Sequence, residues 1–479
     1  MKSIFTSLAL LFCFQLIGQN LVSFSLRESR TKEQLNQSIG PNLPPAKYGL
    51  DIYKVLYTMY DVHGNLDTVS GALYIPVDNG NQVYSLICDM HGTTDRTWYP
   101  SDYFSSTTAF LTVDGDFITY APDYLGLGNS RGFHPYMHAE SQAMAGIEMH
   151  RAVLEVLEVL NIPYDNRLFI TGYSQGGHAA MAMHRLIQQN FSEEINVIAS
   201  SPMSGPYSVK EIMLNRMLED SPYLPGIVFM PYVVLGYQEV YKNLYSDLSE
   251  IFKTTYVGPI QSFRKGEITL QGMATQLAGL LAVFTNSLKP RNMLRDDVLD
   301  ILLNNPGSHP IYAAIADNDL LNWVPNVPVR LFYCTADEQV PYTNSIKALE
   351  YFTEGGANDV KAESKGNLNH GDCVAPATLA TRIFFKSFIT TQTNQVLAHE
   401  IKLYPNPITD GKLNLNIEQG SSLDVGSCFV NIIDLDGKLK GNFSMTGGSI
   451  DVSDLPSGVY FLQIFDMNQN FRNLKFVKI

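Results

Sequence analysis

A serine between two glycines is the first stretch of this sequence that could do chemistry. Gly172, Ser174 and Gly176 form a Gly-x-Ser-x-Gly pattern, preceded by an apolar run and followed by a helix-compatible segment at residues 178–189. A strand, a tight turn and a helix in this order expose a serine hydroxyl, because glycines let the two backbones approach closely. The turn also points the Gln175 N–H toward an oxyanion forming on a substrate. The alternative is a glycine-rich turn with an ordinary serine. The choice depends on whether the chain also supplies a base and an acid for Ser174.

A serine hydroxyl is a poor nucleophile until a histidine takes its proton, and that histidine needs a carboxylate to hold it. On a parallel α/β sheet the three residues follow the chain order Ser, Asp, His, so the base comes late. Only His370 and His399 stand late enough in the chain. His399 adjoins a separate C-terminal segment, whereas His370 lies in a polar loop after a strand-like run. We therefore predict that His370 is the base.

The carboxylate is predicted at the end of the strand before that loop. Asp337 closely follows the apolar run at residues 331–333, which places it at the carboxyl edge of the sheet, beside the histidine loop. Glu338 is the rival by adjacency. We interpret Asp372 as a loop-capping residue, and Asp123 as a residue that fixes a turn by accepting hydrogen bonds from backbone N–H groups.

A second oxyanion donor is expected in the loop after the third strand. The strand at residues 83–90 is followed within three residues by Thr93, whose N–H fits this role. His91 is interpreted as a residue that orders the same loop. His178 and His184 lie on the helix behind the serine and are assigned no chemistry.

The rest of the chain predicts the sheet that carries these loops. Strands alternate with helices at residues 117–200 and 327–389, which is typical of a mostly parallel sheet with helices on both faces. Strand-like runs at 48–60 and 68–75 precede them as an antiparallel hairpin. Residues 205–326 contain helical segments without a clear strand, far more than a βα connection needs. We interpret them as a helical cap over the site; the alternative is that they thicken the core.

The two ends of the chain predict export. Residues 1–19 resemble a signal peptide, with a positive start and an apolar centre, and a polar lead-in follows. Residues 20–389 are predicted to form the catalytic domain and residues 390–400 a polar linker. Residues 401–479 contain short alternating strands separated by turns, which is typical of a small β-sandwich.

Composition narrows the function further. The chain has 479 residues, more than one core usually serves, and its 45% hydrophobic content argues for packed globular domains. A net charge of −14 offers no basic face and argues against nucleic-acid binding. The cysteines are too sparse for a disulfide-built scaffold, and we predict one bridge, between Cys334 and Cys373. His370 and Cys373 lack a second pair at metal-ligand spacing, so neither a metal nor a cofactor is predicted.

With these residues in view, residues 48–389 resemble an α/β-hydrolase, and more narrowly the secretory lipase group. Five motifs occur in order, namely His91-Gly92-Thr93, Ala121-Pro122-Asp123-Tyr124, Gly172-Tyr173-Ser174-Gln175-Gly176-Gly177, Thr335-Ala336-Asp337 and His370. The resemblance implies Ser174 as nucleophile, Asp337 as acid and His370 as base, which agrees with the choice made from the residues themselves.

The end of the chain carries a second resemblance. Its motifs are Leu403-Tyr404-Pro405-Asn406-Pro407, Leu455-Pro456-Ser457-Gly458-Val459-Tyr460-Phe461 and the basic finish at residues 475–478. They resemble the C-terminal sorting domain of the bacterial type IX secretion system. This implies recognition by that secretion machinery and a protein that is released or held at the cell surface. The alternative is a carbohydrate-binding sandwich, for which no aromatic platform is evident.

The sequence thus predicts a secreted serine hydrolase that cleaves carboxylic esters, of the lipase or esterase type, through an acyl-enzyme. A serine peptidase of the aminopeptidase or dipeptidyl-peptidase type is the second hypothesis, because amide and ester cleavage share the triad and the oxyanion hole. A catalytically inactive binding protein is the third, and the intact Ser, Asp, His order argues against it. Apolar runs in the cap, at residues 224–230 and 277–284, suit an acyl chain and favour the ester hypothesis.

Overall fold

The structure is a computed structural model, and it describes residues 20–39, 43–77, 82–398, 401–409, 411–417, 429–434, 439–444, 449–465 and 471–479. The chain divides into two compact units, Met1–Ile383 and Phe384–Ile479, each described by itself below. The predicted signal peptide and His399, the rival base, lie outside the described residues. None of the helices in the described ranges is both long and apolar enough to cross a membrane.

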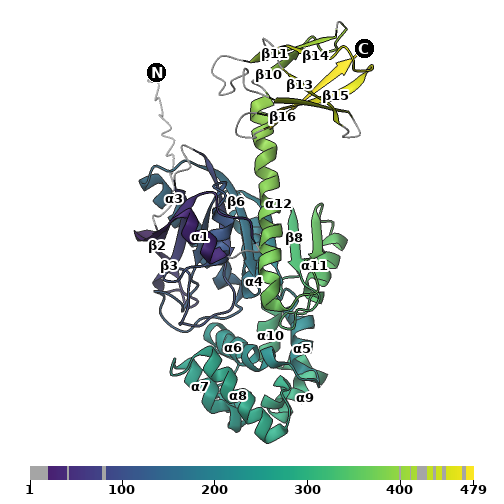
Figure 1. Ribbon diagram of the computed structural model, residues 1–479. Helices are drawn as coiled ribbons and strands as arrows, with labels where there is room; N and C mark the ends of the chain where they lie inside the picture. The colour runs from purple at the N-terminus through teal and green to yellow at the C-terminus, as the bar shows by residue number, and fades with distance from the viewer. Residues whose placement is uncertain are drawn as a thin grey trace, which may run out of the picture. The chain divides into compact units, whose positions relative to one another are not determined.

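A twisted mixed sheet forms the centre of the first unit (Figure 1). Among the described residues it has nine strands in the order β1-β2-β3-β5-β4-β6-β7-β8-β9. The first three strands are antiparallel to their neighbours, whereas β4 to β9 run parallel. The strands are β1 Leu21–Arg30, β2 Gly49–Tyr60, β3 Leu66–Val77, β4 Tyr84–Met90, β5 Phe117–Pro122, β6 Tyr164–Tyr173, β7 Val197–Met203, β8 Val329–Tyr333 and β9 Val360–Ser364.

Helices cover both faces of this sheet, as the sequence predicted. Successive residues of a strand point to opposite faces, so Leu73 and Tyr74 of β3 enter two different apolar clusters. One face carries α3 (Ala139–Val159), α4 (Gln175–Leu186) and α11 (Thr343–Glu354); the other carries α1 (Lys32–Ile39), α2 (Ser106–Thr112) and the described start of α12 (His370–Ala398). Strands β4 and β5 are buried along their whole length because both of their faces are covered.

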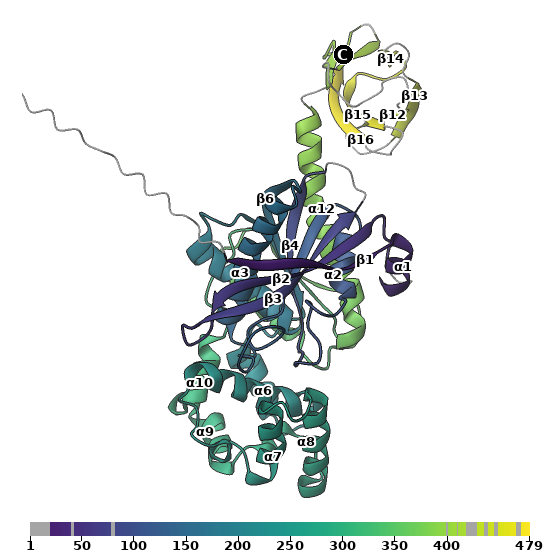
Figure 2. The same cartoon turned by 90° about the vertical axis from the view of Figure 1, so that its left-hand side faces the viewer.

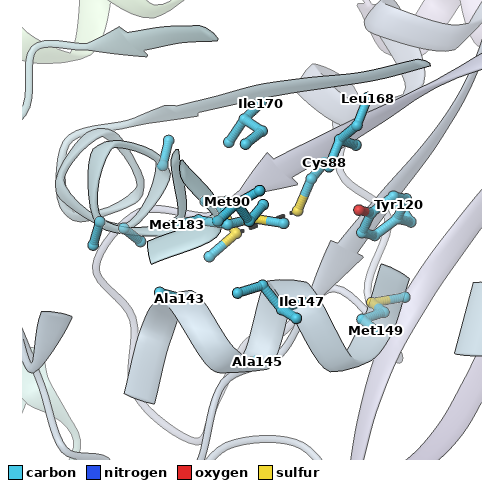
Figure 3. Packing of buried hydrophobic residues seen from close by; sticks show 14 of the residues in the cluster. Cys88, Met90, Tyr120, Ala143, Ala145, Ile147, Met149, Leu168, Ile170 and Met183 are labelled. Carbon is cyan, nitrogen blue, oxygen red and sulfur yellow. Dashed lines mark hydrogen bonds between the residues drawn. The ribbon is translucent and has the colours of Figure 1, made fainter. Parts of the chain in front are cut away.

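A dense core of small and sulfur-containing side chains lies behind the Ser174 turn. Figure 3 shows Met90 at the end of β4 and Met183 of α4 gathered with Ile147 of α3 and Ile170 of β6. Gly146 lets α3 pack closely against α4, because a Cβ at this position would lie 2.6 Å from the sulfur of Met183. This packing fixes the end of β4 against the start of α4.

The chain between β7 and β8 forms the predicted helical cap. Figures 1 and 2 both show its helices gathered beyond one end of the sheet. They bury an apolar cluster of their own, which includes Tyr232, Phe252 and Leu281, so the cap is a separate layer and does not thicken the sheet core. Its helices are α5 Leu214–Leu218, α6 Leu224–Tyr241, α7 Thr254–Arg264, α8 Leu270–Thr285, α9 Asp296–Asn304 and α10 Pro310–Asp317. Shorter turns are η1 Ile187–Phe191 after α4, η2 Val209–Met213, η3 Leu248–Glu250, η4 Pro290–Met293 and η5 Pro306–Ser308.

Two segments differ from the sequence prediction. The polar lead-in contains β1, which pairs with β2 at the edge of the sheet; an edge strand buries little, so its sequence stays polar. Helix α12 begins at His370, which was predicted to lie in a polar loop, and it continues to Ala398 through most of the predicted linker. No glycine or proline stands between residues 377 and 398 to end it.

The described residues of the second unit form two antiparallel sheets, as predicted for a small β-sandwich. Their orders are β10-β11-β14 and β13-β12-β15-β16. Ile408, Leu413, Ile432, Leu462 and Phe476 are fully buried in one cluster that both sheets share. The strands are β10 Ile401–Tyr404, β11 Lys412–Ile417, β12 Phe429–Asp434, β13 Leu439–Ser444, β14 Ser449–Asp451, β15 Gly458–Phe465 and β16 Phe471–Lys478.

Candidate active site

Ser174 occupies a strained turn between β6 and α4. Its backbone has φ 62° and ψ −121°, a conformation that costs a non-glycine residue about 1–3 kcal/mol. The Ser174 N–H donates to the Met203 carbonyl at 3.0 Å, and the Ser174 carbonyl accepts from the Gly177 N–H at 2.9 Å. These hydrogen bonds, made by the N–H and the carbonyl of Ser174, hold the serine in this strained backbone conformation.

The glycines that flank Ser174 are required by close packing. A Cβ at Gly176 would lie 1.8 Å from the Met90 carbonyl oxygen, and one at Gly172 would lie 2.3 Å from the Gly176 carbonyl oxygen. Both contacts are far too short for real atoms. The turn therefore brings the first turn of α4 directly against the end of β4, as the Gly-x-Ser-x-Gly pattern predicted.

Asp337 and His370 meet at the ends of β8 and β9. The distance from His370 Nδ1 to Asp337 Oδ2 is 2.7 Å, and both side chains are buried. The other carboxylate oxygen accepts from the backbone N–H groups of Gln339 at 2.9 Å and Val340 at 2.8 Å. Because an ionised carboxylate only accepts, Nδ1 carries the proton, and His370 Nε2 is left to take one.

Glu338, the rival acid, holds the same histidine in a different way. Its Oε2 accepts from the backbone N–H of His370 at 2.9 Å. His370 is the first residue of α12, where N–H groups have no intrahelical acceptor, and a carboxylate at a helix N-terminus is favourable. Asn369 caps the helix, with its Oδ1 accepting from the Asp372 N–H at 2.9 Å and its Nδ2 donating to the Asp372 carboxylate. The Asn369 and Asp372 pair is the signal that would have placed the helix start.

Ser174 has no direct hydrogen bond to this pair among the described residues. In the described part of the chain, Ser174 Oγ and His370 Nε2 form no hydrogen bond. Tyr173 connects the two loops instead, since its hydroxyl donates to the His370 carbonyl at 2.7 Å and the two rings are 4.9 Å apart. Hydrogen bonds between nucleophile and base often tighten only in the substrate complex.

A disulfide joins the loop of Asp337 to the helix that begins at His370. Cys334 and Cys373 are bonded at 2.07 Å with their Cα atoms 6.0 Å apart, which confirms the predicted pairing. Cys334 stands three residues before Asp337, and Cys373 three residues after His370. The bond ties β8 to α12, and it leaves Cys373 no thiolate with which to bind a metal.

The two predicted oxyanion donors flank Ser174. Thr93 and Gln175 line the same cavity as the serine, and a Cβ at Gly92 would lie 3.9 Å from Ser174 Cβ. The Gln175 N–H belongs to the first turn of α4 and has no acceptor within the helix. Thr93 is fixed from the cap side, because its hydroxyl lies 2.8 Å from the Tyr136 hydroxyl and Tyr136 stacks on a cap tyrosine.

The side chain of Gln175 is held by a buried network that sequence reasoning missed. Its Nε2 lies 2.9 Å from His134 Nε2 and 2.9 Å from Gln142 Oε1. His134 Nδ1 donates to the Leu125 carbonyl at 2.8 Å, so Nε2 is the acceptor of a neutral ring. Burial lowers the pKa of His134 to about 3, which keeps the ring neutral. His134 and Gln142 each lie more than thirty positions from Gln175, so no local pattern links them to it.

The remaining polar candidates have the structural roles that the sequence suggested. Asp123 Oδ1 accepts from the backbone N–H of Ser101 at 2.9 Å. The ring of His91 lies 2.8 Å from the Gly92 carbonyl, and burial lowers its pKa to about 4. His178 and His184 are buried behind the serine, and neither lines its cavity.

With the fold and site described, comparison with known proteins decides the family. Residues 111–381, more than half of the chain, match the secretory lipase family. The chain belongs to the secretory lipase family. Residues 402–478 match the secretion system C-terminal sorting domain. A secretory lipase with this C-terminal domain is secreted or placed at the cell surface.

Solved structures similar to this secretory lipase share its hydrolase fold. The rice cell wall degrading esterase LipA from Xanthomonas oryzae is 27% identical with a TM-score of 0.66, over 78% of this chain and 97% of LipA. A candidate hydrolase from Legionella pneumophila is 24% identical with a TM-score of 0.68, over 77% and 98%. Candida antarctica lipase A is 16% identical with a TM-score of 0.53, over 72% and 77%. No curated protein matches the chain at a significant level. The chain is thus a hydrolase of the lipase or esterase type.

The cavity of this secretory lipase extends from Ser174 into the cap. Among the described residues that line it, none is charged, and the polar ones gather where Ser174, Gln175 and Thr93 meet. The apolar part of the lining includes Met213, Met217, Phe229, Val233, Leu302 and Ile315. The cavity is thus apolar except at the end where Ser174 lies.

Proposed function

We propose that this chain hydrolyses carboxylic esters through an acyl-enzyme. Ser174 Oγ attacks the ester carbonyl while His370 Nε2 takes its proton, and the same proton then passes to the leaving alcohol. Asp337 keeps the Nδ1 proton in place and stabilises the imidazolium. The N–H groups of Gln175 and Thr93 donate to the oxyanion. Water activated by His370 then releases the acid.

The observation that carries this proposal is the uncharged cavity that opens at Ser174. Each methylene that an acyl chain buries there contributes about 0.8 kcal/mol to binding. A peptidase needs groups that align an extended backbone or bind a charged terminus, and the described lining offers none of these beyond the oxyanion end. The 27% identity to LipA, which is an esterase, supports the same choice.

A direct comparison of substrates tests the proposal. We expect kcat/KM for a series of acyl esters to exceed that for aminopeptide and dipeptide amides. A preference for the amides of about tenfold or more, roughly 1.4 kcal/mol of transition-state binding, would instead identify a peptidase. Ser174→Ala measured beside the parent protein shows how much turnover depends on the proposed nucleophile.

We propose the following division of labour along the chain. Residues 20–389 catalyse, and residues 401–479 are recognised by the type IX secretion machinery after a signal peptide at residues 1–19 directs the first export step. The match of residues 402–478 to the sorting domain supports this proposal, as does the absence of any proposed catalytic residue from that segment.

A further inference from the structure

A second open groove, called the outer groove here, lies beside the cap. It lies between the loop at residues 94–97, the helices α6 and α8, and the loop at residues 338–339. Leu224, Val228 and Ala278 supply an apolar side, whereas Thr97 and Gln271 supply hydroxyl and amide groups. The groove is therefore amphipathic, unlike the cavity at Ser174.

The groove adjoins the cavity that contains Ser174. Phe229 lines both spaces, so they meet at this side chain. Thr93 lines the cavity, and the next residue, Thr94, lines the groove. Glu338 lines the groove and holds the backbone of His370. Through Glu338 the groove reaches the first residue of α12, His370, whereas Ser174 and Gln175 line only the cavity.

The chemistry of ester cleavage assigns the two spaces to the two halves of a substrate. The C–O bond to the alcohol breaks while His370 Nε2 delivers a proton to that oxygen, so the alcohol must lie on the histidine side. We propose that the outer groove binds the alcohol half of the ester and selects uncharged, hydroxyl-bearing alcohols over anionic ones. This inference rests on the proposed ester hydrolysis, with the acyl chain in the uncharged cavity.

The charges along the groove carry the selectivity. Among the described residues that line it, Asp95 and Glu338 are the charged ones, and both are acidic. Asp95 Oδ2 accepts from the Leu270 N–H at 2.6 Å, and Oδ1 accepts from the N–H and the hydroxyl of Thr97. An ionised carboxylate has about four acceptor sites, so Asp95 can still accept from a hydroxyl group of the alcohol. The nearby Arg96 donates to the carbonyls of Gly126 and Gly132 and lines a different pocket. An anionic headgroup would therefore meet two negative charges without a cation to pair with.

Two esters that differ only in charge test this inference. A 1-monoacylglycerol and the same monoacylglycerol carrying a 3-phosphate share the acyl chain and the glycerol. We expect kcat/KM to be about tenfold or more higher for the uncharged ester. Gln271→Lys adds a cation to the groove and should narrow the ratio, whereas Gln276→Lys, also exposed on α8 but outside the groove, should leave it unchanged. Equal rates for both esters in the parent protein, or equal effects of the two lysines, would overturn the proposal.

Two variants with a bulky side chain test, independently of charge, whether the alcohol half binds in the outer groove. Ala278→Trp fills the groove, and Ala282→Trp on the same helix lies outside it. With one acyl chain throughout, Ala278→Trp should lower kcat/KM for the glyceryl ester by about tenfold relative to the methyl ester, and Ala282→Trp should not. An unchanged ratio in a folded Ala278→Trp protein, and in Ala274→Trp, would contradict the groove assignment. Failure of the parent protein to cleave even the methyl ester would instead contradict ester hydrolysis itself.

Discussion

Glu338 holds the backbone of His370: its carboxylate accepts the first N–H of α12 at 2.9 Å, while the neighbouring Asp337 accepts from the imidazole at 2.7 Å. Two consecutive acidic residues therefore fix one histidine at two different points. The proximity of His370 and its N–H group also lowers the pKa of Glu338 against the raising effect of burial, so this carboxylate is ionised at neutral pH. We therefore propose that Glu338 is a positioning residue that acts through His370, the proposed base.

The first prediction separates this positioning role from simple stability. Glu338→Ala leaves the His370 N–H without its acceptor and should lower kcat on a methyl ester by about tenfold with little change in KM. Glu338→Gln keeps an oxygen acceptor and should recover most of that loss. The methyl ester is used because its alcohol is too small to fill the outer groove. Equal losses in the two variants would mean that the hydrogen bond to His370 does not matter for turnover.

The second prediction concerns the disulfide. Cys334 and Cys373 close a loop of 39 residues, for which the chain-entropy account gives about 4 kcal/mol of stabilisation. We expect the double variant Cys334→Ser/Cys373→Ser to lose a comparable free energy of unfolding in denaturant titrations, and to lose activity at lower denaturant than the parent. Cys88→Ser is the matched control, because Cys88 is buried and not in a disulfide. Equal stability of the parent with and without reductant would contradict this account.

The third prediction is a pH dependence of stability at Asp89. Burial raises the pKa of Asp89 from 3.8 to about 6, partly offset by the hydroxyl of Thr108 at 2.7 Å. Between pH 4 and 6 the folded state therefore binds more protons than the unfolded state, and stability falls as the pH rises through this window. Asp89→Asn should remove this dependence of stability on pH. The free energy of unfolding of the variant minus that of the parent should therefore increase by up to about 3 kcal/mol between pH 4 and pH 7.

Buried histidines act in the opposite direction but do not obscure that comparison. Burial lowers the pKa of His91 and His178 to about 4. Below about pH 6.5 these histidines take up protons in the unfolded state before they do so in the folded state, so the free energy of unfolding falls as the pH falls. Both proteins contain these histidines, and their effects cancel in the difference. If the Asp89→Asn curve runs parallel to the parent curve from pH 4 to pH 7, the raised pKa of Asp89 is wrong.

Sequence reasoning could place the strands because their signals are local. The apolar runs of β4, β5 and β6 need helices on both faces, and the glycines around Ser174 need a close backbone approach; both requirements are visible in single stretches of chain. The edge strand β1 was not predicted, because an exposed edge strand can have a polar sequence. The start of α12 was misplaced because the capping pair of Asn369 and Asp372 was taken for loop.

The parts of the site that the sequence could not predict depend on long-range contacts. His134 and Gln142 hold Gln175 across more than thirty residues, and nothing near either residue marks the partnership. Glu338 was weighed as an alternative acid, but the order of residues does not say which of two adjacent carboxylates faces the ring. The Asp337 contact with Nδ1 and the Glu338 contact with the backbone separate the two roles.

The fourth prediction concerns the C-terminal segment. A protein that ends at Thr391 keeps β1 to β9, the cap and the buried Phe385 of α12. Its activity on a small soluble ester should stay within about twofold of the full chain, because no proposed catalytic residue is removed. Export to the medium or cell surface of a host with the type IX system should be lost. An inactive but folded truncated protein would show that the second unit shapes the site.

Ser174 is the proposed nucleophile, and its replacement tests the proposed mechanism most directly. Ser174→Ala removes one hydroxyl from a turn whose hydrogen bonds are made by the backbone, so the variant should fold and unfold like the parent. Hydrolysis of a short-chain methyl ester should then fall by about a thousandfold or more, since only oxyanion stabilisation and binding remain. A folded Ser174→Ala protein that hydrolyses the ester at near the parent rate would contradict the proposed mechanism.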